Sequence, residues 1–236
     1  IKDEHEIKLM RKAADISADS HIKAMQVCKP GKYEYQLQAT MESHFVHEGG
    51  TCPAYTSIVG GGDNATVLHY IKNRDELADG DLVLIDAAAE FEMYAADITR
   101  TFPVNGIFSE TQRAVYQVVL DAQKAVIEAS KPGVTFQELH DLDLKLLVEG
   151  MIKIGLLEGT VDQIIEENAY RPYFMHKTGH WLGLDVHDMG KYIIDGNREY
   201  WKPVWSTRSN QAFMLTLNQM LLRNSVESVS ELKTTS

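Results

Sequence analysis

The chain has little of three features that often decide the class of a protein: cysteine, long apolar runs and positive charge. Cys28 and Cys52 are its only cysteines in 236 residues, too few for a disulfide framework, so we expect a reducing, cytoplasmic location. No apolar run reaches the roughly 18–20 residues of a membrane-spanning helix, so we expect no membrane partner. The net charge is −11 with no basic cluster, which argues against nucleic acid as a partner.

What the chain does contain is ordinary for a globular protein. Hydrophobic residues make up 44% of it and charged residues 24%, as in most soluble domains. Its length allows one large domain or two small ones. It begins with Ile1 rather than methionine, which suggests a fragment whose missing N-terminal part could carry targeting information.

Two helix pairs are expected, each joined by the same tripeptide. Apolar spacing predicts a helix over residues 4–28 and another over 35–47, separated by the breaker Lys29-Pro30-Gly31. Ser109 and Thr135 open capping boxes, so two further helices should flank Lys131-Pro132-Gly133. Short strands are expected at 56–59 and 65–70. The repeated order suggests two related α/β halves.

The most informative residues are two aspartates eleven positions apart. Asp86 closes an apolar run that is typical of a buried strand, and Asp97 interrupts a second strand-like run. A hairpin through residues 90–92 would bring the two carboxylates together. Paired buried carboxylates repel each other and lose hydration, so we expect a cation between them. The alternative is that each aspartate only caps a turn.

Histidines far along the chain could complete such a site. His180 is the candidate ligand, and Gly183 would allow a close backbone approach. An oxygen-rich site with one imidazole suits manganese, cobalt or zinc, and two such ions could share a carboxylate and activate a bridging water. His69, His176 and His187 could hydrogen-bond a substrate or an oxyanion. For each histidine alone, a purely structural role is about as well supported.

These residues resemble a known family. The stretches Val67–Tyr70, Asp79–Asp86, Tyr94–Gly106 and His180–Asp188 are similar to the catalytic domain of proline-specific aminopeptidase P, in the creatinase, prolidase and methionine aminopeptidase superfamily. The resemblance covers residues 1–196. It implies an α+β pita-bread fold, two related α/β halves around a curved antiparallel sheet with outer helices.

The resemblance also implies a chemistry. It predicts two divalent metal ions, usually manganese, with Asp86, Asp97 and His180 as ligands and Asp97 bridging. A metal-bridging hydroxide would attack the bond before a proline at position two of the peptide substrate. The implied catalytic residues are His69, His176 and His187, which would line the substrate site. A homo-oligomer is compatible with the resemblance.

The resemblance ends at Gly196, and we interpret residues 197–236 as an aberrant tail in place of the last strands. The family needs two further glutamate ligands, in Val-Glu-Pro-Gly and Arg-Ile-Glu-Asp stretches that this chain lacks. Read one base out of frame and with permitted codon choices, residues 199–236 can encode both stretches. Trp201 before Lys202 also forces a glutamate in a separate preceding stretch, Ile-Leu-Glu-Ala-Gly-Met. The sequence therefore predicts a frameshift near residues 197–199.

The sequence leaves three interpretations of function. The first is an aminopeptidase P catalytic domain. The second is an inactive pita-bread remnant that acts at most as a binding scaffold, because two of five ligands are missing. The third is a related prolidase or methionine aminopeptidase, which would cleave Xaa-Pro dipeptides or the initiator methionine.

Overall fold

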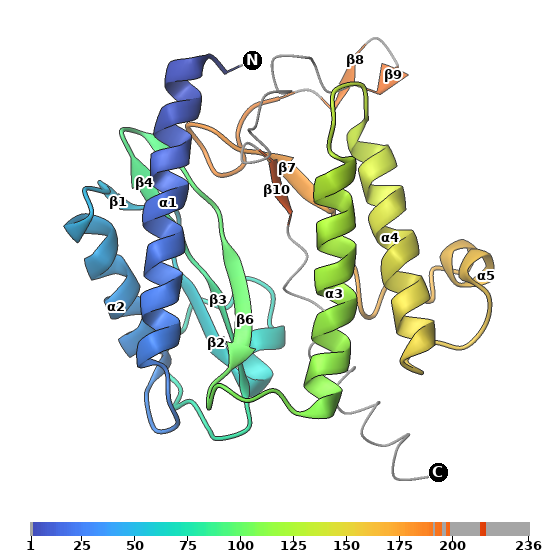
Figure 1. Cartoon of the computed structure of the whole chain (residues 1–236), viewed down its shortest axis with the longest axis horizontal. Coiled ribbons are helices and arrows are strands. Elements are labelled where there is room, and N and C mark those ends of the chain that lie inside the picture. Colours follow the sequence, from blue (N-terminus) through green and yellow to red (C-terminus); the bar gives the residue numbers. More distant parts are fainter. Residues whose placement is uncertain (1, 191, 195–196, 199–212, 216–236) are drawn as a thin grey trace. The chain divides into compact units, whose positions relative to one another are not determined.

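The structure, a computed structural model, describes residues 2–190, 192–194, 197–198 and 213–215 (Figure 1). The chain divides into two compact units. The first unit consists mainly of residues up to 107 together with 180–190, and the second mainly of residues 108–179. Most of the expected tail, 197–236, lies outside the described residues. Among the described residues, no helix is long and apolar enough to cross a membrane.

Two capped helices build one side of the first unit. Helix α1 (Glu4–Val27) begins after Asp3, whose Oδ1 accepts hydrogen bonds from the backbone N–H groups of His5 and Glu6. It ends at Cys28, before the first Lys-Pro-Gly, and α2 (Glu34–His47) follows. Both predicted helices are confirmed to within one residue.

The strands of the first unit form two antiparallel sheets. One has the order β2 (Ile58–Gly61), β3 (Leu82–Asp86), β6 (Thr99–Pro103); the other has the order β1 (Cys52–Pro53), β4 (Ala89–Phe91), β5 (Tyr94–Ala95). Helix α1 packs against β4 and β5, and α2 against β1 and β2. The combination of buried helix faces and antiparallel strands confirms the α+β prediction.

The predicted strand over residues 65–70 is wrong. A 3₁₀ helix, η1 (Gly62–Thr66), and an irregular segment occupy this stretch instead. Thr66 donates a side-chain hydrogen bond to the Asp63 carbonyl, and Asn64 donates to the buried Glu34. Such side-chain bonds compete with strand pairing, and the partner Glu34 is too distant in the sequence for a local pattern to reveal it.

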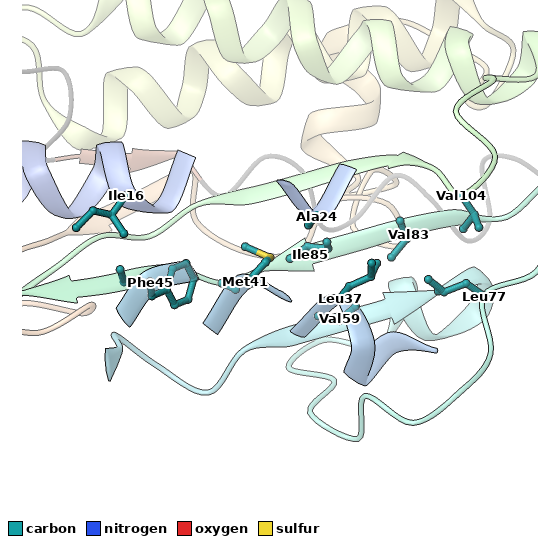
Figure 2. Packing of buried hydrophobic residues seen from close by; sticks show 12 residues of the cluster. Ile16, Ala24, Leu37, Met41, Phe45, Val59, Leu77, Val83, Ile85 and Val104 are labelled. Atoms are coloured by element: carbon teal, nitrogen blue, oxygen red, sulfur yellow. The ribbon is translucent and has the colours of Figure 1, made fainter. Parts of the chain in front are cut away.

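The core of the first unit lies between its helices and strands. Figure 2 shows apolar side chains of α1 and α2 against those of β2 and β3. The cluster consists of Ile16, Ala24, Leu37, Met41, Phe45, Val59, Leu77, Val83, Ile85, Ala87, Ala89 and Val104. Because β3 is buried along its whole length, Asp86 at its end enters this core with the strand.

The second unit is helical. Helices α3 (Glu110–Ala129) and α4 (Phe136–Lys153) pack together, and the short α5 (Val161–Glu166) follows. Both predicted capping boxes are present, at Ser109 and Thr135. Gly150 permits the close approach of the two helices, because a Cβ there would collide with the Val118 side chain. The hairpin β8 (Ile193–Ile194) with β9 (Asn197–Arg198) also belongs to this unit. The remaining pair, β7 (Gly179–Trp181) with β10 (Phe213–Leu215), has most of its residues in the first unit.

Candidate metal centre

The pairing register explains why Asp86 and Asp97 meet. β3 pairs Asp86 with Thr99, and β4 pairs Glu90 with Ala95. The same pairing register continues through the gap between β5 and β6, which places Asp97 opposite Ala88. Because Ala88 is two residues after Asp86, the side chains of Asp86 and Asp97 lie on the same face of the hairpin. The predicted hairpin is confirmed, and Asp97 lies between two strands rather than within one.

A tight turn closes this hairpin. Glu92 and Met93 have φ of 50° and 70°. Positive φ at both central residues is the geometry of a type I′ turn, whose twist matches that of paired strands. The turn therefore fixes the register that brings the two aspartates together.

Tyr55 joins the two carboxylates. Its hydroxyl lies 2.6 Å from Asp86 Oδ1 and 3.1 Å from Asp97 Oδ1, so one proton is shared between two acceptors. Asp86 is 8% exposed and Asp97 9%. Burial, then the charge of Asp97, raise the pKa of Asp86 to about 7. Burial and the two carboxylates likewise raise the pKa of Tyr55. No pattern in the sequence singles out Tyr55, which lies 31 residues before Asp86.

The Nε2 nitrogen of His180 faces this pair. Its Nδ1 lies 2.9 Å from the Trp181 carbonyl, which can only accept, so Nδ1 carries the proton. In the neutral ring Nε2 is then an acceptor, yet it lies 3.1 Å from Asp97 Oδ2, another acceptor. Burial opposes charge on the ring, but the hydrogen bonds to Asp97 and Trp181 outweigh it and raise the pKa of His180. Two facing acceptors need a proton or a cation between them.

These residues fit a divalent cation in three respects. They offer two carboxylates and one imidazole, which are donors that manganese, cobalt and zinc accept. The carboxylates are buried side by side, where their repulsion helps to raise the pKa of Asp86. The ring is oriented by a backbone carbonyl, as metal-bound histidines usually are. Within the described part of the chain, however, no three His, Cys, Asp or Glu side chains are already arranged around one point as ligands.

Two further predicted site residues lie in the first unit. The rings of His187 and His180 meet edge to face at 4.4 Å. Burial, then the charge of His180 and that of His69, lower the pKa of His187 against the opposing effect of Asp97. His69 is exposed and has a φ of 57°, which is uncommon for a residue with a side chain. His176 belongs to the second unit, where its Nδ1 donates to the Lys177 carbonyl at 3.0 Å.

The segment 180–190 is held to the rest of the first unit at two points, by Ala95 and Lys2, and it also carries an internal hydrogen bond. Ala95 N–H donates to the Gly183 carbonyl at 2.8 Å, and Asp188 N–H donates to the Trp181 carbonyl at 3.0 Å. Lys2 Nζ lies 2.8 Å from Asp188 Oδ2 in a half-buried salt bridge. A Cβ on Gly183 would collide with the Asp188 carboxylate and the Lys2 side chain. The predicted close approach at Gly183 is therefore confirmed.

Helix α1 is hydrogen-bonded to the link between β3 and β4 and to the first residue of β4. His21 Nε2 donates to the Ala87 carbonyl at 2.9 Å, and the Ala89 N–H donates to Ser17 Oγ at 2.8 Å. His21 is 2% exposed. Burial lowers its pKa to about 4, and the charge of Arg100 acts in the same direction. The sequence alone assigned no role to His21, because its partner lies 66 residues away.

The low pKa of His21 makes stability depend on pH. The unfolded chain binds a proton near pH 6.5 and the folded chain only near pH 4, so the contribution of His21 is present above pH 6.5 and is lost as the pH falls from 6.5 to 4. Relative to His21→Gln, which keeps a donor but cannot titrate, the native chain should lose about 3 kcal/mol of unfolding free energy between pH 7 and 4. Urea unfolding of both proteins measures this difference. If the unfolding free energies of the two proteins changed equally with pH, this prediction would be contradicted.

Comparison with known proteins places this chain in a family. Residues 8–204 match the model of metallopeptidase family M24. The chain is 50% identical over 198 residues to the Xaa-Pro aminopeptidase of Haemophilus influenzae, covering 84% of this chain and 46% of that protein. It is 46% identical over 197 residues to the Escherichia coli enzyme of the same name, covering 84% and 45%. The chain thus spans less than half the length of these curated relatives.

Solved structures agree with this assignment. Pseudomonas aeruginosa aminopeptidase PepP matches with a TM-score of 0.84 at 37% identity, over 100% of this chain and 60% of that one. A zinc-substituted Escherichia coli aminopeptidase P, solved in complex with product, matches with a TM-score of 0.82 at 36% identity, over 99% and 59%. The likeness confirms the pita-bread prediction. Together with the match over residues 8–204, it shows that the chain belongs to metallopeptidase family M24.

Proposed function

We propose that this chain is the catalytic part of a metal-dependent aminopeptidase that removes the first residue from peptides with proline at position two. The observation that carries the proposal is the contact between His180 Nε2 and Asp97 Oδ2 beside the Asp86 carboxylate. This contact needs a proton or a cation between the two groups, and we favour a cation because the relatives that share the surrounding sequence are Xaa-Pro aminopeptidases.

Asp86, Asp97 and His180 would hold divalent metal. Two ions would complete the centre, with manganese as our first choice and cobalt or zinc as alternatives. Bound metal supplies a Lewis acid and lowers the pKa of water toward neutrality. Tyr55 would keep its single proton on the Asp86 side, where its hydrogen bond is shorter. That arrangement leaves Asp97 as the carboxylate better able to serve two ions.

The three remaining histidines would act on the peptide. His187 has a lowered pKa, so near neutral pH it is uncharged and can donate one hydrogen bond without repelling a substrate amine. His69 is exposed on the irregular segment after η1, where it could reach the peptide. His176 presents Nε2 as an acceptor, because Nδ1 is bonded to Lys177. These roles are hydrogen-bonding contacts with the substrate backbone.

The second candidate function is a scaffold that binds peptides without cleaving them. It rests on the two glutamate stretches that the chain lacks. We propose that a one-base frameshift near residues 197–199 removed them. In support, the family match ends at residue 204 and the sequence likeness to the curated relatives covers only 84% of the chain.

Peptide hydrolysis separates these candidate functions. With manganese added, the chain should release the first residue of an Xaa-Pro-Xaa tripeptide at least about 100-fold faster than that of the matched Xaa-Ala-Xaa peptide, because the site is expected to select proline. Absence of turnover with retained cation binding would favour the scaffold. Cleavage of Xaa-Pro dipeptides alone, or of initiator methionine, would indicate prolidase or methionine aminopeptidase.

A read of the coding DNA across residues 192–236 completes this test. A missing or extra base near Asn197 would restore both glutamates, and the corrected chain should then be the more active one. An intact codon series would contradict the frameshift.

The two cysteines bear on the cellular location. Cys28 and Cys52 are free, and Cys52 is exposed, which supports our proposal of a reducing, cytoplasmic compartment. The expected partners are a peptide with proline at position two and, as a homo-oligomer, further copies of the chain.

A further inference from the structure

The second unit contains a buried hydrogen-bond chain that none of the roles above uses. Thr178 Oγ1 donates to Asp143 Oδ2 at 2.7 Å, and His140 Nδ1 lies 2.9 Å from the same Oγ1. Asp143 is 0% exposed and Thr178 2%. Asp143 and His140 both come from α4 and reach the residue just before β7.

The buried side of helix α4 is an unfavourable environment for the Asp143 carboxylate. Burial raises its pKa to about 7, although the hydrogen bond from Thr178 opposes the shift. Its Oδ1 has no hydrogen-bond partner among the described residues. Its buried neighbours on α4 include Leu139, Leu144 and Leu147. An apolar residue would suit such a place better, so stability alone does not explain the carboxylate.

Helix α4 contacts the segment around His176 at two points, one on each side of this residue. Thr178 is held through Asp143 and His140. The ring of His140 also lies 5.7 Å from that of Phe174, which in turn lies 5.7 Å from the ring of His176 at 65°. His176 therefore stands between two residues that the same helix fixes. Because its Nδ1 donates to the Lys177 carbonyl, the direction of its acceptor Nε2 depends on this short stretch.

We propose that Asp143, Thr178 and His140 form a positioning network that fixes residues 174–178 and thereby aims the acceptor nitrogen of His176. What His176 contacts in a substrate rests on the proposed function; the network itself does not. None of the three residues touches substrate in this proposal, and each acts through the segment between Phe174 and Thr178.

The hydrogen bonds of the network determine which atom carries each proton. Thr178 has one hydroxyl proton, and with Asp143 ionised that proton goes to the carboxylate. Thr178 can then only accept from His140, so His140 must carry its proton on Nδ1. Without the Thr178 hydroxyl or the Asp143 carboxylate, His140 no longer has to carry its proton on Nδ1. The tautomer of His140 therefore reports the network directly, whether or not the chain is active.

The test compares Thr178→Val, which removes the hydroxyl, with Thr178→Ser, which keeps it. At about pH 8.5, imidazole nitrogen NMR, assigned with His140→Gln, should show the Nδ1–H tautomer in the native chain and in Thr178→Ser, and the Nε2–H tautomer in Thr178→Val. Hydrogen exchange at residues 174–179 should become about tenfold faster in Thr178→Val only. With an Xaa-Pro-Xaa peptide, kcat should fall about tenfold while KM changes less than about threefold.

Asp143→Leu gives a second route, since leucine has the same branching as aspartate. Thr178 would then donate to His140, so His140 should again change to the Nε2–H tautomer, without a lower unfolding midpoint. An unchanged tautomer and unchanged exchange in both Thr178→Val and Asp143→Leu would overturn the proposal. The expected NMR and exchange changes, together with no turnover by any variant or by the native chain, would support the network and contradict the proposed function.

Discussion

Replacing Asp97 by asparagine is expected to abolish the stabilisation that a divalent cation gives the native chain. At a cation concentration about a hundred times Kd, binding should add about 2.7 kcal/mol to the unfolding free energy, a rise of about 5–10 °C in Tm for a chain of this size. The asparagine amide cannot supply the negative charge that, in the proposed centre, would hold an ion beside Asp86 and His180. Thermal unfolding with and without manganese measures the loss.

The same variant should be more stable than the native chain when no cation is present. The raised pKa of Asp86 comes from burial and then from the charge of Asp97. The folded-state pKa of Asp86 is raised, so the stability that its protonation contributes is present below pH 3.8 and is lost as the pH rises through about 7; by about pH 8 the Asp86 carboxyl is ionised. Asp97→Asn removes that repulsion, and the new amide can donate to the acceptor nitrogen of His180. We expect a gain of about 1–3 kcal/mol.

Asp185→Asn is the matched control for both effects. Asp185 is exposed and lies five residues after His180, so its neutralisation should leave the cation response and the cation-free Tm nearly unchanged. A cation response in Asp97→Asn equal to that of the native chain would remove Asp97 from the metal centre.

Glu34→Leu is expected to have the largest effect on stability. Glu34 is 0% exposed. One carboxylate oxygen accepts from Gly61 N–H and Asn64 Nδ2, at 2.9 and 3.0 Å, and the other from the Tyr70 hydroxyl and Asp75 N–H, at 2.8 and 3.0 Å. Leucine would leave these donors without their acceptor. At about 1–3 kcal/mol for each unpaired buried group, the loss should be at least about 4 kcal/mol in urea unfolding.

Graded variants identify the cause of that loss. Tyr70→Phe removes one donor and should cost about 1 kcal/mol. Glu48→Gln, near the end of the same helix and partly exposed, should change stability by less than about 0.5 kcal/mol. If Glu34→Leu cost no more than Glu48→Gln, the carboxylate would not be what holds the segment from Gly61 to Asp75.

The elements that could be predicted well are those with local causes. The helices begin at side chains that cap their own first turn, as Asp3, Ser109 and Thr135 do, and the first helix of each pair ends at Lys-Pro-Gly. Asp86 and Asp97 were predictable as a pair because a hairpin joins them. The proximity of His180 to this pair was also predictable, because buried paired carboxylates favour a neighbouring group that can share a proton or a cation with them.

The residues that the sequence did not reveal act over long distances. Tyr55, His21 and Glu34 each contact partners about 30 residues or more away in the chain. Their neighbours in sequence give no pattern that separates them from ordinary tyrosine, histidine and glutamate. The prediction of a strand at residues 65–70 was wrong for the same reason. Asn64 and Tyr70 donate hydrogen bonds to Glu34, about 30 residues earlier in the chain, and do not lie in a pleated strand.

The hairpin of β3 to β6 has a kinetic consequence. Its two carboxylates are joined by about ten intervening residues, and closing a loop of that length takes about 10–100 ns, whereas His180 arrives from 83 residues further along the chain than Asp97. A folding chain should therefore assemble the aspartate half of the centre first and add the imidazole later. In reverse, opening of the segment 180–190 alone would free one ligand while leaving two. If the proposed metal centre forms, we expect this local opening, rather than global unfolding, to set the rate of metal exchange.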